Sequence, residues 1–249
     1  MNWNVGRTHK MELTASAFAV LPCVLHLAPA KLSGTDVCPN RSSGCTAACL
    51  NQSGRGQMNV VQRQRVAKTL RFLADPQGFA DCLTKEARML ERRAVKRGLT
   101  LTLRPNGTSD IPWEQYLPGD VLANCYDYTK SVDRWRSQGY YLTLSWHEEM
   151  RLSPVDLALE ALAAGRPGIA VVCSPELHAH LVTLPDYLGI PVVDGTLHDY
   201  RPSDPPGSMV VLSPLGRAKR DTLGFVVRDE AQLQMPGPRA NKRRLMAAA

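Results

Sequence analysis

The stretch Cys38-Pro39-Asn40-Arg41-Ser42-Ser43-Gly44-Cys45-Thr46-Ala47-Ala48-Cys49 decides how the rest of this sequence is interpreted. It places three of the seven cysteines on one short loop, in the spacing C-x6-C-x3-C. Structural zinc normally takes four Cys or His ligands, often in close pairs. A four-iron cluster usually takes four cysteines, so a loop that supplies three leaves one iron open. The spacing favours a [4Fe–4S] cluster on Cys38, Cys45 and Cys49, with zinc and three free thiols as the alternatives.

Composition sets the bounds for the 249-residue chain as a whole. Hydrophobic residues make up 44% of it, which supports a sizeable core and argues against wholesale disorder. The net charge of +7 suits contact with nucleic acid or another anion. No apolar run is long enough for a membrane span, and no secretion signal is visible. We therefore expect a cytoplasmic protein, where clustered cysteines indicate metal binding or catalysis more than disulfides.

Apolar periodicity and turn residues predict alternating strands and helices. The expected strands cover 17–27, 99–104, 125–129, 140–145, 168–173 and 190–193, with short late strands at 210–212 and 225–227. The expected helices cover 59–73, 79–97, 154–164 and 175–182, the third with Ser153 as its N-cap. An irregular leader over 1–14, a single domain over 15–230 and a flexible basic tail over 231–249 complete the predicted organisation.

Alternation of this kind is typical of parallel βαβ units, and so of an α/β fold. Polar or small residues follow six of the predicted strands, at 38–49, 106–110, 129–131, 145–149, Ser174 and Asp194-Gly195. Because functional sites of parallel α/β proteins gather at the carboxyl ends of strands, we expect these loops to form one pocket.

Four segments carry a resemblance to a known group of proteins: Cys38 to Cys49 with Gly54-Arg55, Arg104 to Trp113, Tyr128 to Ser131, and Gly216 to Phe225. In their order they resemble the radical S-adenosylmethionine superfamily, and more closely a family of bacteriophage and mobile-element proteins with a radical-SAM-like core. The resemblance covers roughly residues 20–228. It implies a partial (β/α)6 barrel with short extra strands near the C-terminus, and the host-cell cytoplasm as the location of a phage-encoded protein.

The resemblance also implies an enzymatic mechanism. Cys38, Cys45 and Cys49 would ligate three irons of a [4Fe–4S] cluster, and S-adenosylmethionine would chelate the fourth through its amino and carboxylate groups. One electron would then cleave the sulfonium and give a 5′-deoxyadenosyl radical, which abstracts hydrogen from a small-molecule or nucleic-acid substrate. In such chemistry the protein mainly binds, orients and excludes water.

Cofactor contacts follow from the same resemblance. The loop Asn106 to Asp110 stands where the superfamily binds the amino group of the methionine moiety, with Ser109 and Asp110 as the contacts. Ser145 and Glu148 stand where ribose and carboxylate contacts arise, and Lys130 could pair with a carboxylate. The cofactor-binding set is therefore Asn106, Ser109, Asp110, Lys130, Ser145 and Glu148.

A non-catalytic alternative remains open at this point. The superfamily spacing is C-x3-C-x2-C, which is tighter than the spacing here. Cys125, Cys173 or His147 could supply a fourth ligand and close the site. The chain would then be a metal-stabilised binding protein, holding zinc or an iron–sulfur cluster, that contacts nucleic acid or a host protein. The basic residues of helix 59–73, among them Arg65, are interpreted as a solvated face or as phosphate contacts.

Overall fold

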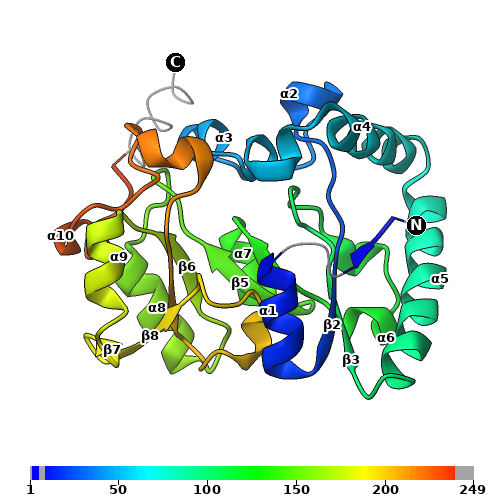
Figure 1. The fold of residues 1–249 in the computed structure, drawn as a ribbon. Coiled ribbons are helices and arrows are strands. Elements are labelled where there is room, and N and C mark those ends of the chain that lie inside the picture. The colour runs from blue at the N-terminus through cyan, green and yellow to red at the C-terminus, as the bar shows by residue number, and fades with distance from the viewer. Residues whose placement is uncertain (1, 6–8, 239–249) are drawn as a thin grey trace.

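The structure is a computed structural model that describes residues 2–5 and 9–238, and it is a mixed α/β fold with two sheets (Figure 1). The smaller sheet has the order β1-β2-β3, with β2 and β3 parallel and β1 antiparallel to β2. The larger has the order β4-β5-β6-β9-β8-β7, and only its edge strand β7 is antiparallel to its neighbour. The strands are β1 Asn4–Val5, β2 Val20–Val24, β3 Thr100–Arg104, β4 Tyr126–Thr129, β5 Tyr141–Ser145, β6 Ile169–Val172, β7 Asp186–Tyr187, β8 Ile190–Asp194 and β9 Met209–Leu212.

One parallel bridge, between Leu103 and Cys125, joins the two sheets. Strands β2 to β6 therefore follow each other in chain order, as an α/β barrel requires. The order breaks beyond β6, because β9 pairs between β6 and β8. A side chain at Gly168 would meet the carbonyl oxygen of Ser208 at 1.9 Å, so glycine is needed where β9 enters beside β6. The described strands form no closed barrel, and the predicted partial (β/α)6 barrel is not confirmed beyond its α/β class.

The helices connect and cover these strands (Figure 1). They are α1 His9–Phe18, α2 Ala30–Ser33, α3 Ser43–Ala47, α4 Asn59–Ala74, α5 Pro76–Val95, α6 Gly119–Leu122, α7 Val132–Ser137, α8 Pro154–Ala163, α9 Pro175–Leu181 and α10 Glu230–Leu233. Short 3-10 turns lie at η1 Leu50–Gln52, η2 Gly54–Gln57, η3 Trp113–Gln115, η4 Arg201–Ser203 and η5 Gly216–Arg220. None of the helices in the described residues combines the length and the apolar character needed to cross a bilayer.

Capping residues and prolines in the sequence mark where helices α8 and α5 begin. Ser153 caps α8 in a capping box with Asp156, which confirms the predicted N-cap. Helix α5 begins at Pro76 rather than at residue 79, because Asp75 caps it and proline suits the first helical position.

Corrections concern mainly the two ends of the chain. The predicted strand over 17–27 is wrong in its first part, since α1 runs to Phe18 and β2 covers only Val20–Val24. Most of α1 lies in the stretch 1–14 that was predicted to be irregular. Short apolar runs do not distinguish helix from strand, which explains the error. The stretch 225–227 forms a single bridge, Cys173 to Val227, instead of a strand. Of the predicted tail, residues 239–249 lie outside the described part.

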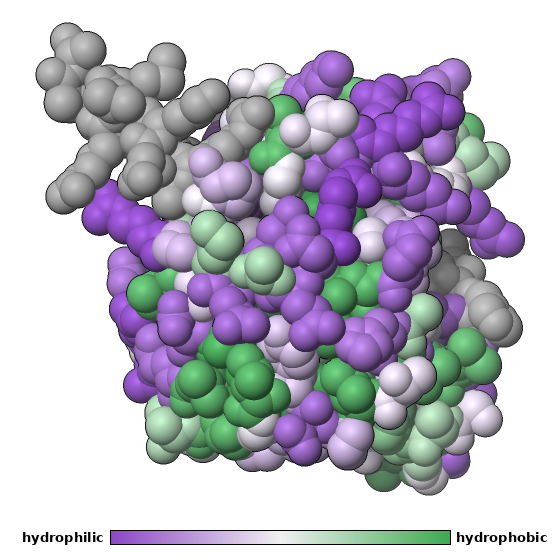
Figure 2. Space-filling view, turned by 90° about the vertical axis from the view of Figure 1, so that its left-hand side faces the viewer, coloured by the Kyte–Doolittle hydropathy of each residue, from purple (hydrophilic) through white to green (hydrophobic). Residues whose placement is uncertain are grey.

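Two apolar cores support the sheets. One packs Leu21, Leu101 and Leu103 of β2 and β3 against α5, and the other packs Ile169 and Val171 of β6 against α8 and α9. Elsewhere on the surface, the face that carries α9 shows hydrophobic residues as separate patches among hydrophilic ones (Figure 2). Helix-covered cores on both sheets leave the strand ends free to present polar loops.

A polar segment after β8 ties the two sheets together. Asp199 pairs with Arg104 of β3 and with Lys10 of α1, and it accepts a hydrogen bond from the Tyr128 hydroxyl of β4 at 3.3 Å. The Tyr141 hydroxyl of β5 donates to the carbonyl of Arg201 at 2.7 Å. Burial alone would raise the pKa of Asp199, but Arg104 and Lys10 lower it to about 2. The segment around Asp199 and Arg201 thus contacts β3, β4 and β5 through ion pairs and hydrogen bonds.

The buried carboxyl group of Asp127 should make the stability of the fold depend on pH. Its buried carboxylate accepts hydrogen bonds from the Asn106 amide and the Tyr140 hydroxyl, each at 3.0 Å. Burial raises its pKa to about 7, although Arg104 opposes this. The folded protein therefore holds a proton that the unfolded chain releases, and the free energy of unfolding should fall between about pH 4 and pH 7 by a few kcal/mol. Asp127→Asn should flatten this slope in urea unfolding series.

The exposed Asp133 at the start of α7 provides the control, because Asp133→Asn should leave the slope as in the wild type. An Asp127→Asn protein whose stability still falls with pH as the wild type does would contradict the assignment to Asp127.

Candidate functional site

The cysteine loop lies beyond the carboxyl end of β2, beside the loops that follow β3, β4 and β5. Cys45 sits in α3, which Ser42 caps by accepting a hydrogen bond from the Cys45 amide at 3.0 Å. Cys49 directly precedes η1 as its N-cap residue, and the Cys38 amide donates to Asp36 at 2.9 Å. All three thiols are half-buried. The fold therefore brings the predicted ligands to the predicted edge of the sheet.

Two carboxylates after β5 hold this loop in place. Glu148 is fully buried, and it accepts hydrogen bonds from the Ser42 hydroxyl at 2.8 Å and the Gly44 amide at 2.5 Å. Glu149 accepts from the amide and hydroxyl of Ser43, at 2.9 and 3.0 Å. Glu148 lies at the predicted strand end, but both of its carboxylate oxygens accept hydrogen bonds from the cysteine loop.

The three thiols lie close enough to influence one another. Burial raises the pKa of Cys38 to about 12, and Cys45 and Cys49 act in the same direction, while Lys130 opposes them. Burial also raises the pKa of Cys45, again against Lys130. Across the described residues, no three His, Cys, Asp or Glu side chains are arranged to hold a single metal ion.

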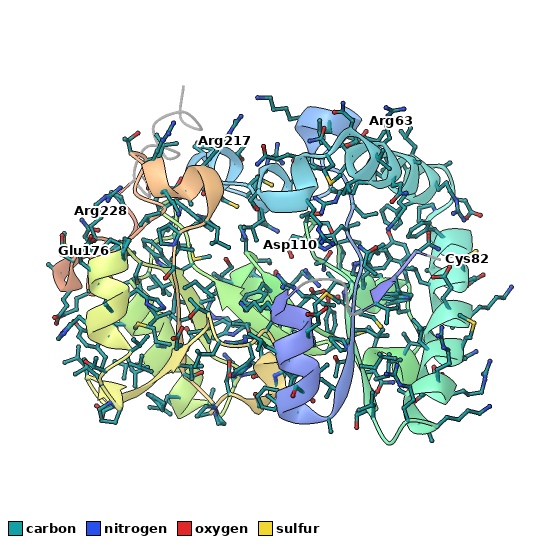
Figure 3. The ribbon with its side chains drawn as sticks, in the orientation of Figure 1. Arg63, Cys82, Asp110, Glu176, Arg217 and Arg228 are labelled. Carbon is teal, nitrogen blue, oxygen red and sulfur yellow. The ribbon has the colours of Figure 1, made fainter. Side chains whose placement is uncertain are left out.

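Lys130 is the main polar neighbour of the thiols. Its ammonium group donates to the Ser145 hydroxyl at 3.3 Å and also hydrogen-bonds Cys45. Burial would lower the pKa of Lys130, but Cys45, Cys38 and Asp110 outweigh burial and raise it. The Lys130 amide donates to Asp110 at 3.0 Å, and Asp110 lies in the middle of the molecule, below the cysteine loop (Figure 3).

Asn106 and Ser109 organise their own loop. The Asn106 side-chain oxygen accepts hydrogen bonds from the Ser109 hydroxyl at 2.7 Å, the Ile111 amide at 2.9 Å and the Trp113 indole at 3.1 Å. Its amide nitrogen donates to the Ile111 carbonyl at 2.9 Å. These contacts fix the loop that presents Asp110, and the predicted roles of all six polar residues toward a cofactor stay predictions.

Arg65 was missed as a neighbour of the site. The sequence pattern indicated part of a solvated face or a phosphate contact, yet the structure turns it toward the cysteine loop. Its guanidinium donates to the side chain of Asn51, and burial lowers its pKa although Cys49 opposes this. The only available signal was its position on the basic helix that directly follows the loop.

The candidates for a fourth ligand lie in other surroundings. Cys125 belongs to the core beside β2 and β3, where its thiol contacts the Val121 carbonyl at 3.3 Å. Cys173 is buried in the core beside α8 and α9. The ring of His147 accepts a hydrogen bond from the Glu149 amide at 3.2 Å. Each of the three therefore has a structural role of its own.

Comparisons with known proteins give one match. The sequence model of the family described as Gene product 88 matches residues 3–229, which is most of the chain. Searches of curated proteins and of solved structures return no match. The family match gives no support for a radical-SAM-like core. The chemistry of the site is therefore argued from the residues described above.

Proposed function

The chain belongs to the gene product 88 family, and we propose that its cysteine loop binds an iron–sulfur cluster. The observation that carries this proposal is the contact between Lys130 and the thiols. A half-buried ammonium group is costly unless anions face it. Asp110 supplies one such anion. Thiolates that ligate a metal cluster would supply two more, because Cys45 and Cys38 are the other groups that Lys130 meets.

The donor set supports a [4Fe–4S] cluster over zinc. Zinc collects four ligands around one ion, whereas the cysteines of a four-iron cluster each bind a different iron and stand further apart. Cys38, Cys45 and Cys49 lie on one short loop, and Cys45 and Cys49 are close enough to Cys38 to raise its pKa. Three ligands on one loop fit a cluster with one open iron.

We propose S-adenosylmethionine as the ligand of the open iron, on the strength of the radical-SAM resemblance. The bound pair would supply reductive cleavage of the sulfonium and hydrogen abstraction from a small-molecule or nucleic-acid substrate. The chain's own part is to hold and orient. Glu148 fixes the loop, Lys130 offsets the thiolate charge, and Asp110 presents a carboxylate beneath the loop.

Metal analysis tests the cluster directly. Protein purified and reconstituted without oxygen should contain about four irons and four sulfides per chain and absorb broadly in the visible range. Replacing Cys38, Cys45 or Cys49 by alanine should remove most of the iron. Cys82→Ala is the matched control, because Cys82 lies on α5 away from the loop (Figure 3). Stoichiometric zinc without iron in the wild type would exclude the proposal.

Ligand binding separates an enzyme from a structural cluster protein. S-adenosylmethionine should bind the iron-loaded wild type and not the Cys45→Ala protein, and reduction with dithionite should release 5′-deoxyadenosine. An iron-loaded protein that neither binds nor cleaves S-adenosylmethionine would keep the cluster but remove the enzymatic part of the proposal.

A further inference from the structure

Helix α4 exposes an apolar stripe on the outside of the molecule. Val60 is 60% exposed and Leu70 is 52% exposed. The exposed residues Ala67 and Ala74 continue this stripe, because they follow Val60 and Leu70 at the spacing of one helix face. Arg63 lies on the same face. This face turns away from both sheets, whereas the opposite face buries Thr69 and Phe72.

A groove runs between this stripe and α2, which lies beside α4 at the top of the molecule (Figure 1). Its lining combines apolar residues with two amides and one basic residue: Leu32, Val66, Ala67, Leu70, Asn59, Gln62 and Arg63. Leu32 of α2 is itself 38% exposed. The groove therefore has an apolar floor that nothing in the described chain covers.

The rim of the groove carries basic side chains from α4. Of the six Arg or Lys residues between Val37 and Ala74, Arg65 faces the cysteine loop, and Arg41 and Lys68 pair with Asp36 and the Asn2 carbonyl. Arg63 belongs to the groove lining and points outward from α4 (Figure 3). Arg71 is exposed one turn beyond Ala67 on the same helix. A partner that carried acidic groups would find complementary charge here.

We propose that the α2–α4 groove binds an acidic amphipathic helix of a partner protein. Such a helix places apolar anchors at i, i+3 or i+4 and i+7 into an apolar groove, while its acidic side chains meet the basic rim. A second copy of this chain would bring two basic surfaces together, which like charges disfavour. Nucleic acid would use the arginines but has no need of the apolar floor. The proposal does not depend on the cysteine loop.

Fluorescence anisotropy with a synthetic peptide tests this proposal. The probe is a helix of about 16 residues with leucine at i, i+3 and i+7 and glutamate on the rest of its surface. It should bind the full-length wild type and weaken as salt rises. Leu70→Asp and Arg63→Glu should each weaken binding about tenfold or more. Leu159→Asp, at a 43% exposed leucine on α8, is the matched control and should bind as the wild type does.

Three results would overturn the proposal. The first is no binding, or equal binding of a scrambled peptide with the same composition. The second is tighter binding of a DNA duplex of about 20 base pairs, weakened by Arg63→Glu and unchanged by Leu70→Asp. That result would mean that the arginines form a phosphate-binding surface. The third is a wild-type dimer that Leu70→Asp dissociates, because a second copy would then cover the face.

Discussion

Replacing Gly44 by alanine should lower the free energy of unfolding by about 3 kcal/mol and remove most of the bound iron. A β-carbon at this position would stand 2.7 Å from the Glu148 carboxylate and 2.7 Å from the Phe225 β-carbon. Both distances are far below van der Waals contact, and both neighbours are buried or nearly so. The loop would have to move away, and the hydrogen bond from the Gly44 amide to Glu148 would be lost.

Urea unfolding and iron analysis of the Gly44→Ala protein measure the two effects separately. Gly119→Ala is the matched control, because a β-carbon on Gly119 meets nothing within 4 Å. The control should stay within about 0.5 kcal/mol of the wild type. Equal stability of the two variants would mean that Gly44 does not pack against Glu148 as described.

Lys130→Met should separate the stability of the metal-free protein from its ability to hold a cluster. Without metal, the substitution removes a half-buried charge, and Asp110 keeps its ion pair with Arg134 at 2.8 Å. The free energy of unfolding should therefore stay within about 1 kcal/mol of the wild type. With metal, the thiolates of Cys45 and Cys38 lose the cation that faces them. Affinity for the cluster should then fall roughly 10- to 100-fold, as is usual when a neighbour of metal ligands is removed.

Iron retention during titration with a chelator gives this affinity, and urea unfolding of the metal-free protein gives the stability. Lys130→Arg keeps the charge and should recover much of the affinity, while Lys85→Met, at an exposed position of α5, should change neither quantity. If Lys130→Met destabilised the metal-free protein and left iron retention intact, Lys130 would be a structural residue, and the proposed cluster would lose its main support.

The sequence predicted those parts of the fold that depend on local signals. Helices α4 and α8 carry both a 3.6-residue period and clear ends, and Ser153 and Pro154 fix the start of α8. The apolar strand β6 was recognised because it is buried on both faces. The strand-end rule also brought Lys130 and Ser145 to the cysteine loop.

The rest depends on contacts between distant residues, which a single sequence does not reveal. Glu148 stands 104 residues from Gly44, and nothing near it in the sequence indicates that it anchors the cysteine loop. Arg65 has the pattern of a solvated residue because helical periodicity describes only one element at a time. The placement of β9 between β6 and β8 was likewise invisible, since strand order follows from pairing energies and not from the period of either strand.

The position of β9 has a consequence for the route by which the chain folds. Strands β2 to β6 can pair in the order in which they leave the ribosome, but the partner of β6 arrives only after β8 has been synthesised. Until then the edges of β6 and β8 that β9 will join leave their backbone N–H and C=O groups unpaired, and unpaired edges promote misassembly. Such late, non-local pairing slows folding. Insertion of β9 should therefore be the rate-limiting step in refolding, with the region of β2 to β5 protected from hydrogen exchange first.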